Sequence, residues 1–251
     1  MSFQFQRYVD FRVLDIESQP LPEDEALRFA PEFEPDGRLK DPVKIEEDVA
    51  RKRTEWLQDC ALRPQTGKVA AIGLLSDSGA ITTHVRFPEE ELLYWFWNDV
   101  LNSDPNTYYL TFFGNGFDIP FLIRRSWKLG VGFPSWVIDD VGNISRRFVD
   151  IARIWRCGNY QDRISLKHLS LHLNVGDKDD RKSEAFYSLS QEEATEHLRN
   201  DLILTARCAH KMGLLHPHAG MLQIIWPGST TVQPSPPLNA GETPAPKHSA
   251  P

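Results

Sequence analysis

The sequence has 251 residues, 41% of them hydrophobic and 25% charged, and its formal net charge is −7 at pH 7. These proportions are ordinary for a soluble globular protein. The negative charge argues against a protein that coats nucleic acid by bulk electrostatics, but it leaves room for a local site whose acids are neutralised by metal ions. No stretch approaches the ~18 consecutive apolar residues that a membrane span requires.

The N-terminus and the cysteines both favour a cytoplasmic protein. The first residues, MSFQFQRYVDF, contain no basic region followed by an apolar stretch, so we expect no secretory signal. Cys60, Cys157 and Cys208 lie far apart and form no CxxC pair. Such a sparse, odd set is typical of reduced thiols, and a zinc site built on cysteine is not expected.

Hydrophobic periodicity predicts alternating strands and helices along the chain. The expected strands cover residues 8–15, 68–75, 80–87 and 107–113, with a turn at 76–79 joining the second and third as a hairpin. The expected helices cover residues 88–102, 118–130, 165–174 and 190–213. The sequence therefore predicts an α/β fold, in which a mixed sheet is flanked by helices on both faces.

Residues 22 to about 66 interrupt the path from the first strand to the hairpin. They contain one charged amphipathic helix, predicted at 41–64, with irregular flanks. This insertion is either a surface helix without a role or a lid that guides substrate, since long insertions near a site often carry function. The sequence leaves both interpretations open.

The C-terminal segment, residues 227–251, is rich in Pro, Ser, Thr and Ala and has few large apolar residues. It cannot bury enough surface to offset the entropy lost on ordering, so we expect a disordered tail. The tail is a candidate docking segment for a protein partner. The folded domain is expected to span residues 1–226.

Acidic residues occur in three places where surface patterning does not explain them. Asp15 and Glu17 end the first predicted strand, and residues two apart on a strand point to one face. Asp118 begins a helix directly after an apolar run, and Asp201 lies inside an amphipathic helix next to apolar residues. Four carboxylates at the edge of one sheet would surround two divalent cations about 4 Å apart. Oxygen ligands favour Mg²⁺ or Mn²⁺.

These motifs, in this order, resemble the DEDD superfamily of 3′–5′ exonucleases. Asp15 and Glu17 match its Asp-x-Glu motif, and residues 117–120 match its Phe-Asp-x-Pro element at a helix start. His197 and Asp201 match its third motif, a Tyr or His that precedes the last Asp on a helix. The most similar group is the predicted exonucleases related to the proofreading domain of family-B DNA polymerases. The resemblance covers roughly residues 8–214.

The resemblance implies an RNase H-like fold with a helical insertion after the first strand, and an enzyme that uses two Mg²⁺ or Mn²⁺ ions. The implied catalytic residues are Asp15, Glu17, Asp118, His197 and Asp201. The four acids are the implied metal ligands, and Phe117 and Asn115 are the implied substrate-binding residues.

Two positions depart from the family pattern. In the tyrosine-type group the acid/base residue lies four positions before the last Asp, and in the histidine-type group it lies five before. His197 stands four positions before Asp201, one helical turn away on the same face. An imidazole titrates near neutral pH and is a competent base for water, although a surface histidine is the plainer alternative. Phe113 stands where the family often has Asn, and Asn115 follows two residues later.

The resemblance implies hydrolysis of the 3′-terminal phosphodiester of DNA, preferentially single-stranded, with release of nucleoside 5′-monophosphates. Three alternatives stay open from the sequence. The same fold would serve an exoribonuclease, because no residue is seen to recognise the 2′-hydroxyl. A non-catalytic nucleic-acid-binding module would keep the fold but would not need four clustered acids. A proofreading subunit would act in trans, through the C-terminal tail.

Other residues have both a functional and a structural interpretation. Asp150 has a family-like position, but an acid that caps the next segment explains it equally well. Three aromatic residues are candidates for base stacking, although aromatics are more often packed in the interior: Trp127, Trp155 and Tyr160. Basic clusters, which are usually solvated faces but are also candidates for phosphate contact, occur at residues 51–53, 124–128, 146–147 and 178–182.

Overall fold

The computed structural model describes residues 10–177 and 183–227, and the expected C-terminal tail from residue 228 onward lies outside this range. The described residues form one mixed five-stranded sheet with the strand order β3-β2-β1-β4-β5. The strands are β1 (Phe11–Pro20), β2 (Gly67–Ser76), β3 (Ile81–Val85), β4 (Tyr108–Thr111) and β5 (Phe148–Asp150). β1 pairs antiparallel with β2 and parallel with β4, so the mixed sheet that the sequence predicts is confirmed.

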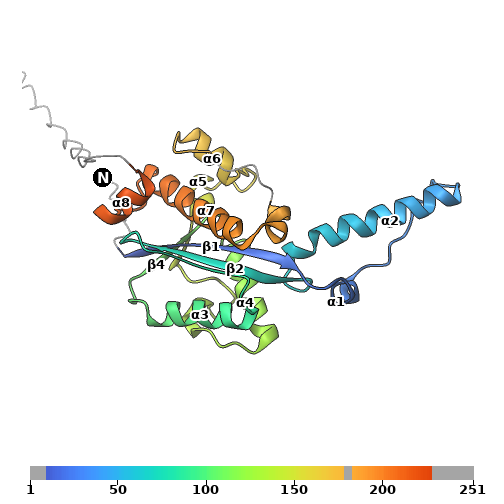
Figure 1. Cartoon of the computed structure of the whole chain (residues 1–251), viewed down its shortest axis with the longest axis horizontal. Coiled ribbons are helices and arrows are strands. Elements are labelled where there is room, and N and C mark those ends of the chain that lie inside the picture. Colours follow the sequence, from blue (N-terminus) through green and yellow to red (C-terminus); the bar gives the residue numbers. More distant parts are fainter. Residues whose placement is uncertain (1–9, 178–182, 228–251) are drawn as a thin grey trace, which may run out of the picture.

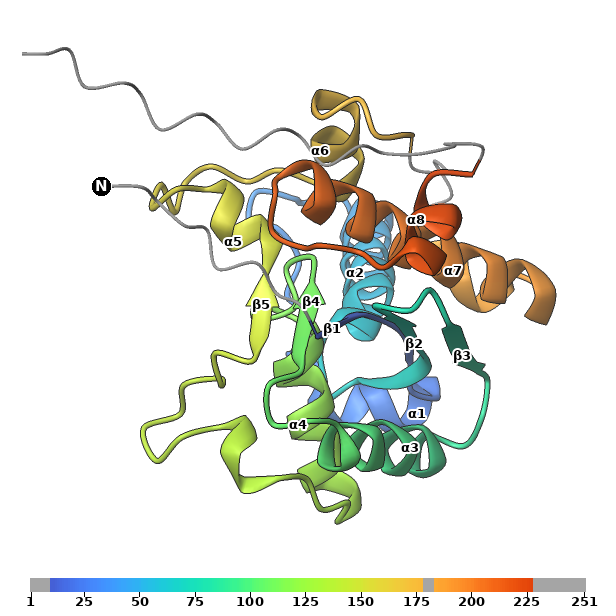
Figure 2. The ribbon, with the colours of Figure 1, turned by 90° about the vertical axis from the view of Figure 1, so that its left-hand side faces the viewer.

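Helices cover both faces of the sheet (Figure 1). One face carries α3 (Glu89–Asn102) and α4 (Asp118–Leu129), and the other carries α5 (Ile151–Trp155), α6 (Leu166–His172), α7 (Gln191–Lys211) and α8 (Ala219–Ile225). Figure 2 looks at the sheet from its end and shows these two helical layers on either side of it. Two short 3₁₀ helices also occur, η3 (Ser135–Val137) between α4 and β5 and η4 (Ser183–Ser188) between α6 and α7. None of the helices in the described ranges is both long enough and apolar enough to cross a membrane.

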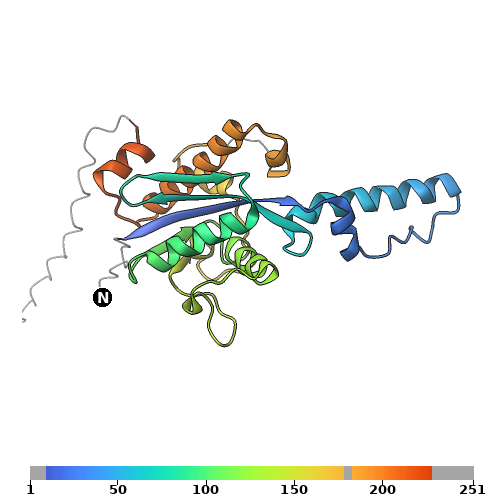
Figure 3. The same cartoon turned by 60° about the horizontal axis from the view of Figure 1, so that its bottom comes forward.

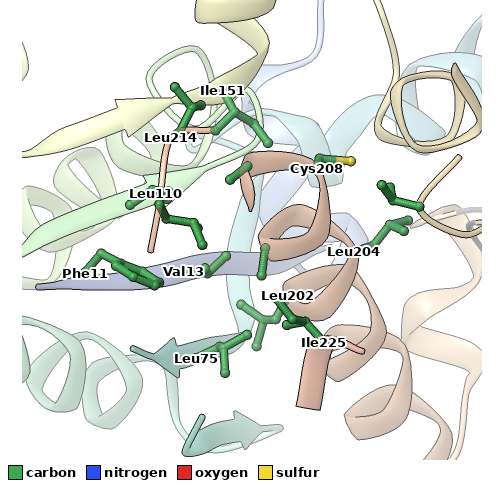
Figure 4. Close-up of a cluster of buried hydrophobic side chains, with 14 of the residues drawn as sticks. Phe11, Val13, Leu75, Leu110, Ile151, Leu202, Leu204, Cys208, Leu214 and Ile225 are labelled. Carbon is green, nitrogen blue, oxygen red and sulfur yellow. The ribbon is translucent and has the colours of Figure 1, made fainter. Parts of the chain in front are cut away.

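The central strand β1 connects the two halves of the core, because its side chains alternate between the faces. Phe11 and Val13 pack in a buried cluster with Leu202 of α7 (Figure 4). Leu14 and Ile16 belong to a second buried cluster, which α3 and α4 cover. β1 continues to Pro20, five residues beyond its predicted end, because it stays paired with β2 over that length.

α7 is the longest helix among the described residues and begins and ends close to its predicted limits. Ser190 caps its start: the Ser190 side chain accepts a hydrogen bond from the backbone N–H of Glu193, and the Glu193 side chain accepts one from the backbone N–H of Ser190. This capping box satisfies two of the N–H groups that a helix start leaves unpaired. Gly213 follows the helix with a φ of 72°, a left-handed conformation that suits glycine.

The insertion forms an arm that extends away from the sheet (Figures 1 and 3). It contains α1 (Glu23–Ala26), η1 (Leu27–Phe29), α2 (Pro42–Gln58) and η2 (Asp59–Leu62), so the predicted helix at 41–64 is shorter and ends in a 3₁₀ turn. Asp41 caps α2 by accepting a hydrogen bond from the N–H of Val43, and Pro42 occupies the first helical position. No residue of α2 is buried, so only the base of the arm joins the core.

Candidate metal-binding active site

Asp15 and Glu17 leave β1 on the face that α7 covers, because they continue the alternation of Phe11 and Val13. The two acids therefore share a face, as their spacing predicts. Glu17 is buried and Asp15 is partly buried. The register of β1 against β2 shifts directly after Glu17, and such bulges re-aim side chains and are common beside active sites.

α7 brings His197 and Asp201 to Glu17. Nε2 of His197 lies 3.3 Å from Oε1 of Glu17 and 3.9 Å from Oδ2 of Asp201. All three side chains are buried, so His197 is not a surface histidine. Among the described residues, Glu17, His197 and Asp201 each offer a ligand atom within 4.8 Å of the others, a spacing that suits a shared cation.

Asp118 reaches the same place from the end of β4. A tight loop follows Thr111 and turns the chain into α4, whose first residue is Asp118. Oδ1 of Asp118 accepts a hydrogen bond from the backbone N–H of Ile16 at 3.2 Å, which ties the start of α4 to β1 between the two acids of that strand. Gly114 makes the loop tight enough, since a Cβ at this position would lie 2.3 Å from the Thr111 side chain.

A cleft of about 340 Å³, which we call the acid cleft, opens over these residues. Four of the five acids that line it come from β1, α4 and α7, namely Asp15, Glu17, Asp118 and Asp201, and the fifth is Asp59 of η2. The base of the arm supplies another wall, with Gln58, Asp59, Ala61 and Leu62. The sequence left a substrate-guiding role of the insertion open but named no residue of this wall, and it missed Tyr187 of η4, which also lines the cleft. The only available signal was the position of the insertion, directly after the strand that carries the first two acids.

Burial dominates the electrostatics of Asp118. The side chain is 4% exposed, and this desolvation raises the pKa of its carboxyl group from 3.8 to about 7. Hydrogen bonds from its own backbone N–H and from Ile16 oppose the shift, whereas the nearby charges of Glu17 and Asp150 add to it. A cation in the cleft would favour the ionised carboxylate.

Asp150 has a structural role beside the cleft. Its Oδ1 accepts hydrogen bonds from the N–H groups of Ala152 and Arg153 at the start of α5, so the interpretation as a cap is confirmed. The same oxygen accepts the N–H of Phe113 at 3.0 Å. Asp150 therefore holds the loop that leads to Asp118, a contact that the sequence did not indicate because β5 is only three residues long and was not predicted.

The two predicted substrate-binding residues lie in different places. Phe117 lines the acid cleft and also packs against the core, with its ring 5.3 Å from that of Phe121. Asn115 lines a neighbouring cleft instead, and its Nδ2 donates to the carbonyl of Phe148 at 3.3 Å. The role of Asn115 in substrate binding stays a prediction that the lining of the acid cleft does not support.

The structure shows the surroundings of the aromatic residues and of the basic clusters. Trp127 and Tyr160 are exposed, so the interpretation as interior packing does not apply to them, whereas Trp155 is partly buried against the core. In the cluster at 51–53 all three cations form ion pairs with acids of the arm. In the cluster at 146–147, Arg147 donates to backbone carbonyls and lies over the Trp136 ring. The cluster at 178–182 lies outside the described residues.

Comparisons with known proteins identify the family and the fold. The model of a family described as predicted 3′–5′ exonucleases related to the exonuclease domain of PolB matches residues 61–191, just over half of the sequence. The chain belongs to this family. The resemblance that the motifs suggested is thus confirmed, and the protein is placed among predicted 3′–5′ exonucleases. Of the acids in the cleft, only Asp118 lies inside the matched segment.

A solved structure shows the same fold. The family B DNA polymerase from the hyperthermophilic archaeon Pyrobaculum calidifontis matches 81% of this chain with a TM-score of 0.51 and 16% sequence identity. The match covers 24% of the polymerase, so this chain spans about a quarter of that protein. The likeness shows that the sheet and its flanking helices are RNase H-like. A search of curated protein sequences finds no significant match.

The residues of the cleft fit a divalent cation. Carboxylate oxygens are the ligands that Mg²⁺ and Mn²⁺ prefer, and this cleft gathers four carboxylates with one imidazole beside them. Burial raises the pKa of the Asp118 carboxyl group, and a cation beside it would stabilise the ionised form. The exonuclease fold implies that the enzyme uses divalent metal.

Proposed function

We propose that the protein hydrolyses the 3′-terminal phosphodiester of single-stranded DNA and releases nucleoside 5′-monophosphates. The observation that carries this proposal is the lining of one cleft by four carboxylates from β1, α4 and α7. A module that only bound nucleic acid would gain nothing from these acids, because they repel phosphate. An enzyme that holds cations at the scissile bond requires them.

Asp15, Glu17, Asp118 and Asp201 are the proposed ligands of two Mg²⁺ or Mn²⁺ ions. When bound, two such ions lower the pKa of a water molecule and stabilise the leaving 3′-oxygen. The chain itself fixes the ligands before any ion arrives. The backbone of Ile16 holds Asp118, and the rigid α7 places Asp201 beside Glu17.

His197 is the proposed general base, which takes the proton of the attacking water. Its Nε2 lies 3.3 Å from Oε1 of Glu17, so the imidazole is held beside a carboxylate that lines the cleft. The same distances would suit a direct metal ligand. His197→Ala distinguishes the roles: loss of a base lowers kcat and removes a limb of the pH–rate profile, while loss of a ligand weakens metal affinity measured by calorimetry.

Exposed apolar side chains support a single-stranded substrate with unpaired terminal bases. Leu62, Phe113 and Tyr187 line the cleft and are all exposed. Phe117 lines the same cleft and packs against the core. Bases stack on such side chains with little regard to sequence. DNA rather than RNA is proposed on the family resemblance alone.

The test is digestion of matched single-stranded DNA and RNA, labelled at either end, with a series of divalent cations. We expect Mn²⁺- or Mg²⁺-dependent loss of nucleotides from the 3′ end of DNA. Asp15→Asn and Asp201→Asn should abolish the activity, whereas Asp140→Asn, at an exposed acid outside the cleft, should not.

Three outcomes would change the proposal. Faster digestion of RNA would make the protein an exoribonuclease with the same site. Full activity of both Asp15→Asn and Asp201→Asn would remove the acid cleft from the reaction. Absence of activity together with absence of divalent-cation binding by calorimetry would indicate a non-catalytic module.

A further inference from the structure

A second pocket, of about 320 Å³, lies between the start of the arm and α4. Figure 1 shows α1 beside the base of the arm, on the side of the sheet that carries α4. The rim of the pocket carries three cations, Arg28, Arg124 and Lys128, and a single acid, Glu25. We call the pocket with these three cations the basic pocket. Its positive charge contrasts with the net charge of −7 of the whole chain.

Within residues 10–177 and 183–227, the three cations have no ion-pair partner, unlike the arginines of α2 and the neighbouring Arg125. Among the described residues, none of them forms an ion pair or donates a hydrogen bond, and all three are exposed. The arginines of α2 differ, because Arg51 binds Asp48 and Glu55, and Arg53 binds Glu23. Three unpaired cations around one cavity repel each other unless an anion lies among them.

The floor of the basic pocket is neutral and rigid. Arg125 is buried and donates two hydrogen bonds to the carboxylate of Glu89, at 2.8 and 2.6 Å. Its remaining Nη1 donates to the carbonyl of Pro64 at 3.0 Å, which fixes the base of the arm to α4. Arg125 is therefore occupied, and only the rim cations are available to a ligand.

The helix α4 carries residues of both the acid cleft and the basic pocket. Arg124 and Lys128 follow Asp118 by six and ten residues, which places them about 9 and 15 Å along the helix axis at ~1.5 Å per residue. With a rise of about 3.4 Å per nucleotide, this corresponds to about three to four nucleotides. Exposed aromatic rings accompany the cations, Phe29 in the pocket and Trp127 on the same helical face as Arg124.

We propose that the basic pocket binds phosphates of the substrate strand a few nucleotides upstream of its 3′ end. This inference rests on the proposed exonuclease function. It adds a second place where the protein contacts the strand, outside the acid cleft. Cations next to exposed aromatic rings are what a single strand requires, because phosphates bind the cations and bases stack on the rings. An acidic peptide would use the cations but not the rings.

The test compares Arg124→Ala/Lys128→Ala with the parent protein in fluorescence anisotropy titrations of single-stranded DNA. Labelled oligonucleotides of about two to about twelve nucleotides are used without divalent cations, so that no turnover occurs. Lys44→Ala/Lys211→Ala removes the same charge at two exposed lysines, near the start of α2 and at the end of α7, and serves as the control.

We expect the affinity of the parent protein to rise with length and the double variant to lose most of this rise, about tenfold in Kd for the longest oligonucleotide. The slope of log Kd against log salt should fall by about 1.4, since two phosphate contacts are lost. The control should follow the parent. Unchanged Kd and slope in Arg124→Ala/Lys128→Ala would overturn the inference, as would equal displacement of DNA by polyglutamate of similar length.

These binding data do not depend on the active-site assignment. If the acid cleft is not the catalytic site, Asp15→Asn and Asp201→Asn digest DNA like the parent protein. Arg124→Ala/Lys128→Ala still binds DNA more weakly in that case. If the basic pocket is not a phosphate site, Arg124→Ala/Lys128→Ala binds DNA like the parent protein. Asp15→Asn and Asp201→Asn still lose their activity in that case.

Discussion

Two largely buried carboxylates of this protein, Glu89 and Asp118, have opposite surroundings. Glu89 is matched by the buried guanidinium of Arg125, with two hydrogen bonds in the fork geometry that suits a carboxylate. Asp118 has no basic side chain within ion-pair distance among the described residues, and burial raises its pKa to about 7. Burying a charge is costly in both places.

The difference shows where the fold leaves a charge for a ligand to neutralise. At Glu89 the chain supplies its own cation, and the result is a fixed joint between α3, α4 and the base of the arm. At Asp118 further carboxylates gather instead, which is unfavourable unless a cation binds. The predictions below act on one side of this comparison or the other.

The largest effect is expected for Asp118→Asn on activity. The amide keeps the shape of the side chain but removes its charge, and a proposed metal ligand is lost. We expect kcat for digestion of single-stranded DNA to fall by about 10³-fold or more. Circular dichroism should show an unchanged fold, and activity within tenfold of the parent would exclude Asp118 from the metal site.

Removal of the Arg125 guanidinium, which pairs with Glu89, should lower the free energy of unfolding more than any other single substitution proposed here. Arg125→Met leaves the Glu89 carboxylate buried without its partner, so we expect a loss of about 3–5 kcal/mol in the free energy of unfolding, measured with urea. The double variant Glu89→Leu/Arg125→Met should recover most of this loss. If the single variant were as stable as the parent, the buried pair would not be the joint described above.

The stability of the metal-free protein should depend on pH through Asp118. Its pKa is about 7 in the folded chain against 3.8 for the ordinary group, so between these values only the unfolded chain releases the proton. The free energy of unfolding should therefore fall as pH rises from about 4 to about 7, by at most about 4 kcal/mol, and change little above that. Asp118→Asn should remove this part of the pH dependence in urea titrations.

Added Mn²⁺ should counteract the fall in the free energy of unfolding that accompanies rising pH. A divalent cation binds the ionised carboxylates, so it should stabilise the parent protein more at pH 8 than at pH 5. The Asp118→Asn variant should gain less. Equal stabilisation of parent and variant at both pH values would show that the ion binds elsewhere.

A smaller effect is expected for Gly114→Ala in the loop before Asp118. The added Cβ would collide with the Thr111 side chain, so the loop must shift, at a cost of about 1–3 kcal/mol. Because the loop leads directly to Asp118, activity should fall as well. Gly132→Ala is the control, since nothing lies within 4 Å of a Cβ there, and it should change stability by less than about 0.5 kcal/mol.

The sequence predicted those parts of the fold that depend on local patterns. The alternation along β1 placed Asp15 and Glu17 on one face, and Ser190 and Gly213 marked the ends of α7. β5 was missed because a three-residue buried strand has no periodicity of its own. β1 was predicted too short because its last residues are held by pairing with β2, which a local pattern does not reveal.

The site was predictable as a set of acids but not as a cavity. The order of the motifs identified Asp118 and Asp201, which the fold then brings together with the acids of β1. The wall from the arm, at Asp59 and Leu62, depends on how the insertion folds back, and no local pattern encodes this. For a related reason, the sequence did not show which cations of a basic cluster are paired: the pairing of Arg125 with Glu89 joins residues 36 positions apart.

The most direct measurement is an anomalous difference map from a crystal of the protein soaked in Mn²⁺. We predict two peaks about 4 Å apart in the acid cleft, within coordination distance of carboxylate oxygens of Asp15, Glu17, Asp118 and Asp201. A cleft without anomalous density at saturating Mn²⁺, with these four carboxylates turned away from one another, would contradict the metal-dependent exonuclease proposed here.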